Sequence, residues 1–406
     1  MFFQTLDDKT ECVGIYTEGA LYFDPEEFPP DLTKTWKYAP YLSGLDVEYA
    51  SLYLEGKKLT DVLPEYLLDD WGDVSKKISA FKRSLAISHV NMDENCFFDL
   101  APKRFLVELC EARNKVTEYV LHNIPKPERY EFYKHVSMML SEIENKEVVL
   151  EKSIIRSYSK HAKLGNQAHS ILSGSPCVKY NQFGTKTGRL TTAKNTFPVL
   201  TLNKEFRSAV KPQNDFFVEL DFNGAEVRTL LGLLKKPQPE GDVHNFHIKE
   251  VFGGSHTRAS AKTSFFAWLY GSKTAVNKSV ALKLNDFYKK DALLDDYWDG
   301  TAIRTPYKKV IPCDSKHYAL NYLVQSTAAE LTLKQALKIN YLLNTRASGS
   351  FLAFVIHDAI VLDMKNEDKN LLRVVAKMMR STNFGTFGIN IHEGKNLGSL
   401  RKIEVV

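Results

Sequence analysis

Four residues between positions 258 and 270 combine two positive charges with two aromatic rings at a constant spacing. Arg258, Lys262, Phe266 and Tyr270 follow one another at intervals of four within the stretch SHTRASAKTSFFAWLYG. Four residues turn an α-helix by about 400°, so these side chains share one slowly winding face. Cations on such a face can bind a triphosphate, and flat rings can pack on a sugar or a base. A half-buried surface helix, with snorkelling cations and rings in the core, would have the same pattern.

Two aspartates stand where apolar strands are predicted to end. Asp221 follows the run 216–220, and Asp358 lies in a predicted tight turn, after His357, between strands 351–356 and 359–362. If the strands are neighbours, the two carboxylates meet, and their repulsion requires a cation. Oxygen ligands without a nearby His or Cys favour Mg²⁺ or Mn²⁺ over zinc. Each aspartate could instead only cap a turn.

The elements that must position these residues divide the chain into a mainly helical first part and an α+β second part. Residues 1–30 predict a hairpin from the strands ECVGIY and ALYF, and residues 41–150 are expected to be mostly helical. A basic helix is expected over 146–170, and short strands alternate with helices after residue 180. One helix face within 41–150 is predicted from Tyr41, Leu42, Leu45, Tyr49, Leu52 and Tyr53.

Two helix starts are predicted beside the chemical residues. Ser255 is expected to cap the helix that bears the cations and rings, and Gly271 to end it. The turn Asn223-Gly224 is expected to begin a second helix that bears Glu226 and Arg228.

The composition is that of an ordinary globular protein without a membrane span. Of 406 residues, 44% are hydrophobic and 25% are charged, and no run of 18 apolar residues occurs. The acidic start MFFQTLDDKTE lacks the pattern of a signal peptide. The five cysteines lie far apart without a CxxC, so we expect neither a zinc site nor a disulfide framework, and a reducing cytoplasm.

The charges are distributed unevenly along the chain. Residues 1–150 contain 17 Lys and Arg against 27 Asp and Glu, whereas residues 151–406 contain 37 against 22. A positive surplus in one part favours a polyanionic partner there, because neutralised phosphates release counterions. Charge alone would also suit a chaperone or a ribosome-associated protein.

Several segments together resemble the family A DNA polymerases, the bacterial DNA polymerase I class, over residues 180–406. The similar segments, in chain order, are TKTGRLTT (185–192), DFNGAEVR (221–228), DVHNFHIKEVFG (242–253), the helix with its R-x-x-x-K-x-x-x-F-x-x-x-Y-G pattern, NYLVQSTAAEL (321–331) and VIHDA (355–359). Each segment alone is a modest signal. Their common order makes the resemblance specific.

The resemblance implies an α+β fold shaped like a right hand, with an antiparallel palm sheet, helical fingers and a helical thumb. A small N-terminal accessory lobe would precede it. The expected parts are 1–95 for the accessory lobe, 96–180 for the thumb, 181–230 for the first part of the palm, 231–315 for the fingers and 316–406 for the second part of the palm.

The resemblance also implies template-directed addition of deoxynucleotides to a primer 3′ end by a two-metal mechanism. Asp221, Asp358 and the backbone carbonyl of Phe222 would hold two Mg²⁺ ions, which Mn²⁺ can replace. Lys262 would be catalytic at the α-phosphate. The expected dNTP-binding residues are His244, Arg258, Lys262, Phe266, Tyr270 and Glu226. The expected primer–template residues are Arg189, Asn321, Gln325 and His357.

Two positions depart from the family pattern. Ala359 stands where the family has a Glu, and His317 stands where it has an Arg. Neither change removes a metal ligand or a triphosphate cation, so we expect activity with an altered grip on the primer end or altered fidelity.

The first 100 residues lack a convincing proofreading domain. Asp46-Val47-Glu48 mimics the D-x-E of a 3′→5′ exonuclease, but we expect it on a helix and without the other carboxylates. The acidic N-terminal lobe would instead serve packing or the docking of other replication proteins.

Two other functions stay open. A single-subunit RNA polymerase of the same palm class is one, and Glu226, expected beneath the sugar, argues against it. A non-catalytic DNA-binding replication factor is the other, and its signature would be a lost metal carboxylate or a lost Lys262. We expect a monomer without membrane contact, in a bacterial cell or, given the compact build, a phage-infected host cell, acting in replication or repair.

Overall fold

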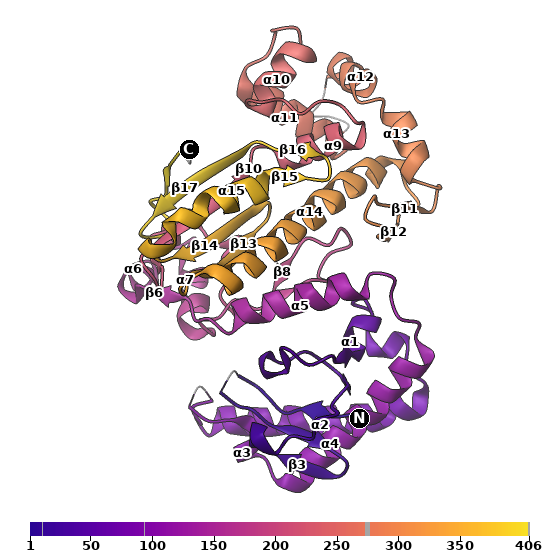
Figure 1. Cartoon of the computed structure of the whole chain (residues 1–406), viewed down its shortest axis with the longest axis vertical. Helices are drawn as coiled ribbons and strands as arrows, with labels where there is room; N and C mark the ends of the chain where they lie inside the picture. Colours follow the sequence, from indigo (N-terminus) through magenta and orange to yellow (C-terminus); the bar gives the residue numbers. More distant parts are fainter. Residues whose placement is uncertain (10, 93, 273–276, 405–406) are drawn as a thin grey trace. The chain divides into compact units, whose positions relative to one another are not determined.

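The computed structural model describes residues 1–9, 11–92, 94–272 and 277–404. The chain forms two compact units, Met1–Asn145 and Lys146–Val406 (Figure 1). The boundary between them falls inside the range 96–180 that we expect for the thumb, and the assignment of thumb, fingers and palm ranges stays a prediction. No helix among the described residues combines the length and apolar character that a membrane crossing needs.

The unequal charges of the two parts coincide with the two units. Residues 1–145 contain 16 Lys and Arg against 26 Asp and Glu, and residues 146–406 contain 38 against 23. The positive surplus therefore belongs to one folded unit rather than to a tail.

The first unit combines short strands with three long helices. Its strands are β1 (Gln4–Thr5), β2 (Ile15–Thr17), β3 (Ala20–Tyr22), β4 (Lys34–Thr35) and β5 (Glu48–Tyr49). Its α-helices are α1 (Ala50–Tyr53), α2 (Glu65–Ile87), α3 (Phe97–Leu100), α4 (Lys103–Asn123) and α5 (Tyr130–Glu144). Helices α2 and α4 pack against each other, and the prolines at 125 and 127 lie in the joint between α4 and α5.

The predicted N-terminal hairpin is confirmed. Strands β2 and β3 pair antiparallel, with Thr17 opposite Ala20. The two turn residues, Glu18 and Gly19, have φ angles of 48° and 85°. Positive φ at both central residues matches the right-handed twist of the strands, which explains the glycine at the second position.

The predicted helix face over 41–53 is wrong for most of its length. Only Ala50–Tyr53 is α-helical, while Glu48–Tyr49 forms β5, which pairs parallel with β4. Gly44 has a φ of 96° and interrupts any helix before it reaches Leu45, which is exposed. Pairing with a strand distant in sequence therefore overrode the local apolar period.

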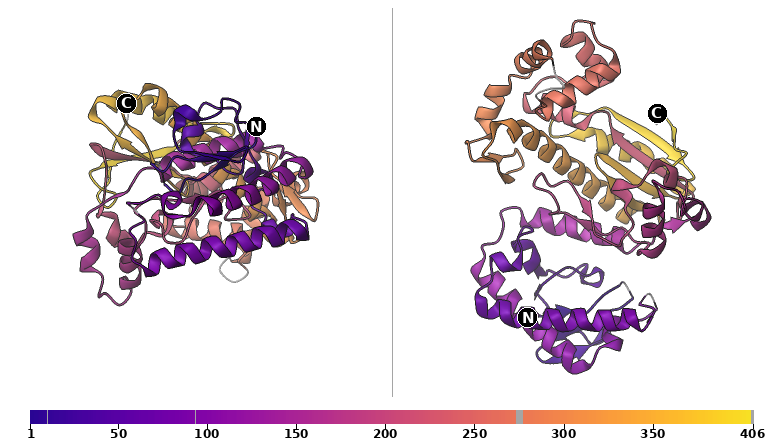
Figure 2. Two further views of the ribbon diagram at one scale, coloured as in Figure 1. Left: turned by 90° about the horizontal axis from the view of Figure 1, so that it is seen from below. Right: turned by 180° about the vertical axis from the view of Figure 1, so that it is seen from behind.

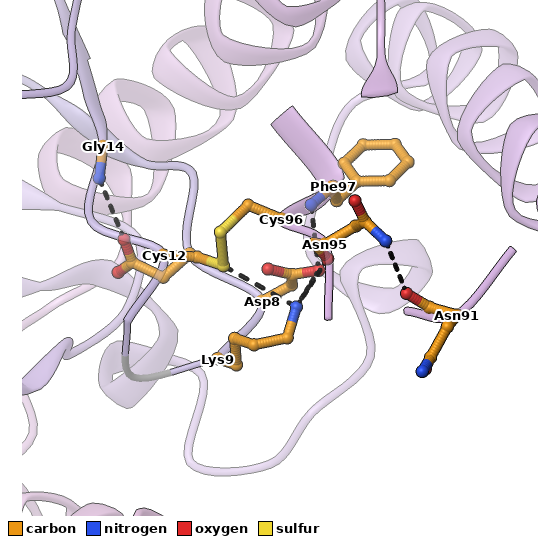
Figure 3. The surroundings of a disulfide bond; sticks show 9 residues. Asp8, Lys9, Cys12, Gly14, Asn91, Asn95, Cys96 and Phe97 are labelled. Carbon is orange, nitrogen blue, oxygen red and sulfur yellow. Dashed lines mark hydrogen bonds and ion pairs between the residues drawn. A yellow bond between two sulfur atoms is a disulfide. The ribbon is translucent and has the colours of Figure 1, made fainter. Parts of the chain in front are cut away.

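The expectation of no disulfide is also corrected, because Cys12 and Cys96 are joined (Figure 3). The two residues lie 84 positions apart, so their spacing contained no signal. The loop between β1 and β2 reaches the segment before α3: Lys9 Nζ donates to the carbonyl of Asn95 at 2.7 Å, and the amide of Phe97 donates to Asp8 Oδ2 at 3.1 Å. These polar contacts bring the two sulfurs together.

The second unit contains a central sheet covered by helices. Its longer strands are β10 (Phe216–Phe222), β13 (Phe351–Ile356), β14 (Ala359–Met364) and β17 (Ile389–Gly394). Its short strands are β6 (Val149–Leu150), β7 (Tyr180–Asn181), β8 (Thr191–Thr192), β9 (Val210–Lys211), β11 (Ala302–Arg304), β12 (Val310–Pro312), β15 (Ser381–Thr382), β16 (Gly385–Thr386) and β18 (Arg401–Lys402).

The helices of the second unit range from one turn to more than eight. They are α6 (Lys152–Ser157), α7 (Gly165–Ser173), α8 (Lys204–Arg207), α9 (Ala225–Leu233), α10 (Val243–Glu250), α11 (Arg258–Leu269), α12 (Lys278–Phe287), α13 (Lys290–Tyr297), α14 (Lys316–Arg346) and α15 (Leu372–Arg380).

The central sheet has five antiparallel strands in the order β13-β14-β10-β17-β18. The predicted strand 351–356 is confirmed residue for residue, and the predicted strands 216–220 and 359–362 each extend two residues further. Helix α14 packs on β13 and β14, and α15 packs on α14 and β17, so both cover the sheet (Figures 1 and 2). This sheet and its helices form the frame on which the strand-end aspartates stand.

The predicted basic helix over 146–170 is wrong as a single element. Residues 149 and 150 form β6, which pairs with β9, and only then do α6 and α7 follow. Gly165 begins α7 where a Cβ atom would lie 2.8 Å from the carbonyl oxygen of Ser159. The backbone therefore turns too tightly there for one continuous helix.

Candidate active site

One predicted strand-end aspartate lies on β10, and the other lies in the turn that leads into the neighbouring strand β14. Strand β10 pairs antiparallel with β14, and Asp221 stands opposite Ala359, the residue after Asp358. Asp358 itself occupies the two-residue turn between β13 and β14, where His357 has a φ of 56°. Phe222, whose carbonyl was predicted as a metal ligand, is the last residue of β10 and its side chain is buried.

Both carboxylates have raised proton affinities, and burial in a poorly solvated site is the main cause for each. Burial raises the pKa of Asp221 to about 7, and the charge of Asp358 adds to the rise. Burial also raises the pKa of Asp358. A side-chain hydrogen bond with Asn390 and the charge of Lys262 oppose the rise in the Asp221 pKa, but they do not cancel it. The pair thus forms an anionic site that favours an added positive charge.

A tyrosine that we did not predict supports the turn containing Asp358. Strand β13 is at the edge of the sheet, so its outer backbone groups lack a strand partner. The hydroxyl of Tyr180 donates to the Val355 carbonyl at 2.9 Å and accepts from the Val355 amide at 3.1 Å. This double contact fixes β13 two residues before the turn. Nothing in the sequence around this lone tyrosine indicated its contact with Val355.

Helix α11 presents the cations and rings as predicted, although its start differs. Thr257, not Ser255, caps it by accepting a hydrogen bond from the Ser260 amide at 3.2 Å. Gly271 ends it with a φ of 74°. The opposite face of the helix is buried and consists of Ala261, Phe265, Trp268 and Leu269.

The predicted row itself stays outside that core. Arg258, Lys262 and Tyr270 are exposed and Phe266 is half-buried, with 5.7 Å between the Phe266 and Tyr270 ring centroids. The alternative in which both rings join the core is therefore wrong for Tyr270, which is 42% exposed.

Asp242, at the start of α10, binds the first cation of the row. One carboxylate oxygen accepts from the amides of His244 and Asn245, each at 3.0 Å, which caps the helix. The other accepts from Arg258 Nη2 at 2.6 Å. His244 is buried, its Nδ1 has no hydrogen-bond partner among the described residues, and burial lowers its pKa to about 4. His244 is therefore a neutral ring at pH 7.

Glu226 lines a cavity of about 320 Å³. Its carboxylate is 6% exposed, pairs with Arg189 and accepts a hydrogen bond from the Tyr270 hydroxyl at 3.1 Å. Burial raises the Glu226 pKa, while the Arg189 charge opposes that rise. Arg189, Phe266, Tyr270, His357 and Asp358 all line the same cavity. Five predicted site residues thus meet around Glu226.

The other predicted primer–template residues lie on α14. Gln325 Oε1 accepts from the Thr187 hydroxyl at 2.7 Å, which joins two of the resembling segments. Asn321 stands one turn earlier, and its buried Oδ1 has no hydrogen-bond partner among the described residues. His317, another turn earlier, lies against Gly271, where a Cβ atom would be 2.5 Å from the histidine ring.

Arg228 is a positioning residue whose role the sequence left open. It is completely buried and donates to the carbonyls of Asn223 (2.8 Å), Pro239 (2.8 Å) and Gly241 (2.9 Å). These bonds connect the turn after β10 to the loop before Asp242. The sequence feature that could have indicated this role is an arginine within a run of residues that is otherwise typical of a buried helix.

Asp46 and Glu48 belong to no group of three or more His, Cys, Asp or Glu side chains that could hold a metal ion among the described residues. Asp46 is fully exposed on a loop and pairs with Lys134 at 3.4 Å, while Glu48 lies on β5 and pairs with Lys126 at 2.9 Å. The predicted helical placement of this pair is therefore wrong, and each carboxylate has a lysine partner.

The donors around Asp221 fit a hard divalent cation. Two carboxylates and a backbone carbonyl at one strand end supply only oxygen, and the charge of Asp358 adds to the rise that burial causes in the pKa of Asp221. Mg²⁺ prefers such oxygen ligands and keeps several waters.

The chain was compared with known proteins. No protein-family model matches it, and no curated protein matches it in sequence. Among solved structures, it is similar to the POL domain of Pol1 from M. smegmatis, in complex with DNA primer-template and dNTP. The TM-score is 0.68 at 10% identity, over 98% of this chain and 95% of that chain.

The second unit and the similarity together define the class of fold. The chain has the α+β fold of a DNA polymerase domain, with an antiparallel sheet flanked by helices. At 10% identity the similarity concerns the fold alone.

Proposed function

We propose that this protein is a template-directed DNA polymerase of the family A type, which adds deoxynucleotides to a primer 3′ end. The single observation that supports it most is the placement of Asp221 on β10 beside the β13–β14 turn that bears Asp358, within the electrostatic influence of Lys262. An oxygen-ligand metal site beside a cation is what nucleotidyl transfer requires. The fold of the similar polymerase domain, which was solved with primer-template DNA and dNTP, agrees with this proposal.

In this proposal Asp221, Asp358 and the Phe222 carbonyl hold two Mg²⁺ ions. The ions, when bound, lower the pKa of a hydroxyl nucleophile and stabilise charge on the leaving pyrophosphate. Lys262 neutralises charge at the α-phosphate, and its exposed ammonium is free to follow the substrate. When both carboxylates are ionised and bind the Mg²⁺ ions, the positive charge relieves the repulsion from Asp358 that adds to the raised pKa of Asp221.

The nucleotide occupies the cavity lined by Glu226 in this proposal. Phe266 packs on the sugar, Tyr270 lies near the templating base, and Arg258 binds the outer phosphates. His244 is buried and neutral, so it contributes a hydrogen bond rather than a charge. The primer–template duplex contacts Arg189, Asn321, Gln325 and His357, whose polar atoms test the shape of a base pair without reading sequence.

Replacing either aspartate tests the proposal directly. Asp221→Asn and Asp358→Asn should each reduce primer extension with Mg²⁺ by about a thousandfold or more, because a metal ligand is lost. Primer–template affinity should stay within about twofold, since the duplex is bound by distributed cations. Asp295→Asn, at an exposed position on α13, is the control. Substantial extension by either aspartate variant would refute the two-metal assignment.

The same assay separates the competing functions. A single-subunit RNA polymerase would extend with rNTPs in preference to dNTPs, and a non-catalytic replication factor would bind the duplex and extend with neither. We also propose that Asp46 and Glu48 give no 3′→5′ exonuclease activity, because each is paired with a lysine. Steady shortening of a mismatched primer that is lost in Asp46→Ala would contradict this.

A further inference from the structure

Three aromatic rings form a stack at the beginning of α14, outside the cavity. The rings of Tyr318 and Tyr322 are nearly parallel, with centroids 6.0 Å apart and 17° between their planes. His317 packs edge-on against Tyr318, with centroids 4.8 Å apart. Tyr322 is half-buried against the hydrophobic core of the second unit, whereas Tyr318 is 49% exposed. Tyr318 is therefore a partly exposed ring that Tyr322 supports from the core side.

This stack begins beside the wall of the candidate active site. His317 lies against Gly271, and Gly271 follows Tyr270, which lines the cavity. Tyr270 in turn lies 5.7 Å from Phe266 between ring centroids. Aromatic rings thus continue from the nucleotide cavity, past the end of α11, to the outer surface of α14.

The exposed tyrosine faces a different direction from the residues proposed to follow the duplex. The proposed primer–template residues Asn321 and Gln325 stand four residues apart and share one row of α14 with His317. Tyr318 and Tyr322 form the next row, about 100° further around the helix. Packing does not require this second row to be aromatic, because half of the Tyr318 surface is left in water.

The charge of the surroundings suits nucleic acid. The unit that contains α14 has 38 Lys and Arg against 23 Asp and Glu. Lys316 precedes the stack and is 55% exposed, with Asp291 at 2.7 Å as its partner. Arg304 is exposed on β11, which packs against α14 (Figure 1). An exposed ring in a unit with a positive surplus suits single strands, in which bases stack and phosphates are neutralised.

We propose that Tyr318, supported by Tyr322, stacks on an unpaired base of the template strand, ahead of the nucleotide that pairs in the cavity. An unpaired base has a free face, whereas a base inside a duplex is already stacked on both sides. The site is therefore specific for single-stranded template and indifferent to its sequence. This inference rests on the proposed polymerase function.

Binding to two primer–templates with the same duplex tests the proposal. One has a single unpaired template nucleotide and the other has about six. The wild-type protein should bind the long overhang at least about fivefold more tightly, as expected for one stacked base. Tyr318→Ala and Tyr318→Leu should lose that advantage, Tyr318→Trp should keep it, and none should alter affinity for the short overhang.

A fluorescent base analogue gives a second readout. With 2-aminopurine at the second unpaired template position, the first beyond the base that pairs in the cavity, wild-type protein should quench the fluorescence by stacking, and Tyr318→Leu should not. Tyr341→Ala is the matched control, because Tyr341 is 72% exposed on the same helix, 23 residues and about 35 Å away. It should behave as the wild type in both measurements.

Two results would overturn the proposal. Equal losses on short and long overhangs would place Tyr318 at the duplex, and unchanged binding would mean that it contacts no DNA. Both measurements are made without catalysis. A wild-type protein that binds long overhangs through Tyr318 but extends no primer would therefore refute the polymerase function and leave the stacking site intact.

Discussion

Asp242 Oδ2 accepts a hydrogen bond from Arg258 Nη2 at 2.6 Å, while the other oxygen of the same carboxylate caps α10. The guanidinium proposed to bind the outer phosphates is thus already paired with a carboxylate of its own chain. A triphosphate has to replace Asp242 as its partner, so the strength of this pair sets part of the nucleotide affinity.

Neutralising Asp242 should make nucleotide binding easier. Asn keeps the capping oxygen, so Asp242→Asn should retain α10 while it weakens the pair with Arg258. An exposed ion pair is worth about 0.2–1 kcal/mol, so the KM for dNTP should fall by up to about fivefold with little change in kcat. Steady-state kinetics at low and high salt would measure this, and salt should reduce the difference.

The control for that experiment is Asp286→Asn, which removes an exposed pair with Lys289 at 2.9 Å elsewhere in the same unit. It should leave KM unchanged. A higher KM for Asp242→Asn, accompanied by a lower melting temperature, would instead mean that the carboxylate matters through the helix cap alone.

The raised pKa of Asp221 makes the stability of the metal-free protein depend on pH. Burial and the charge of Asp358 raise this pKa from 3.8 to about 7 in the folded state. The stabilisation by the bound proton is complete below about pH 4 and is lost as the pH rises through about 7. Because of the Asp221 carboxyl, the metal-free protein should therefore have a lower melting temperature at about pH 8 than at about pH 5.5.

Asp221→Asn removes that titration and should stabilise the metal-free protein at about pH 8 by on the order of 1–3 kcal/mol. Mg²⁺ should raise the melting temperature of the wild type at this pH and leave that of Asp221→Asn nearly unchanged, because the ion binds only the intact pair. Differential scanning calorimetry with EDTA or Mg²⁺ would measure both. An equal response of the two proteins to Mg²⁺ would contradict the metal site.

Glu226 should exclude ribonucleotides. It lines the cavity together with Phe266, so a 2′-hydroxyl entering there would meet its carboxylate. Glu226→Ala should increase rNTP incorporation relative to dNTP by about tenfold or more, since a steric clash typically costs about 1–3 kcal/mol. Single-nucleotide insertion kinetics with matched rNTP and dNTP would measure the ratio.

The partners of Glu226 allow a structural role of this residue to be distinguished from the exclusion of ribonucleotides. The change to Ala also leaves Arg189 and the Tyr270 hydroxyl without this carboxylate, so some loss of stability and dNTP rate is expected. Glu226→Gln keeps the volume and an acceptor for Tyr270, so it should keep the exclusion of rNTPs. Equal losses for both substrates in Glu226→Ala would mean that Glu226 only supports the site.

The disulfide should stabilise the first unit specifically. It closes a loop of 84 residues, for which the chain-entropy argument gives a stabilisation of about 4.5 kcal/mol. Cys12→Ser, or a reductant, should increase hydrogen exchange in β1, β2 and α3 and leave the central sheet of residues 146–406 unchanged. Cys177→Ser, outside the disulfide and in the other unit, is the control. Unchanged exchange in the reduced protein would contradict this role.

The sequence by itself determined the elements whose signals are local. The four-residue row on α11 follows from helical geometry, and the hairpin containing Asp358 follows from two apolar runs around a two-residue turn. The turn at Asn223-Gly224 was predictable because Gly224, with a φ of 71°, adopts a conformation that glycine tolerates. In each case neighbouring residues alone select the backbone conformation.

The tertiary structure decided whatever depends on residues far apart in the chain. It placed Asp221 beside the turn of Asp358, paired Arg258 with Asp242, and joined Cys12 to Cys96. It also replaced two expected helices, over 41–53 and 146–170, with strands β5 and β6 and shorter helices, because pairing with β4 and β9 outweighed the local apolar period. Local propensities differ by at most about 1 kcal/mol per residue, so distant strand pairing and burial override them.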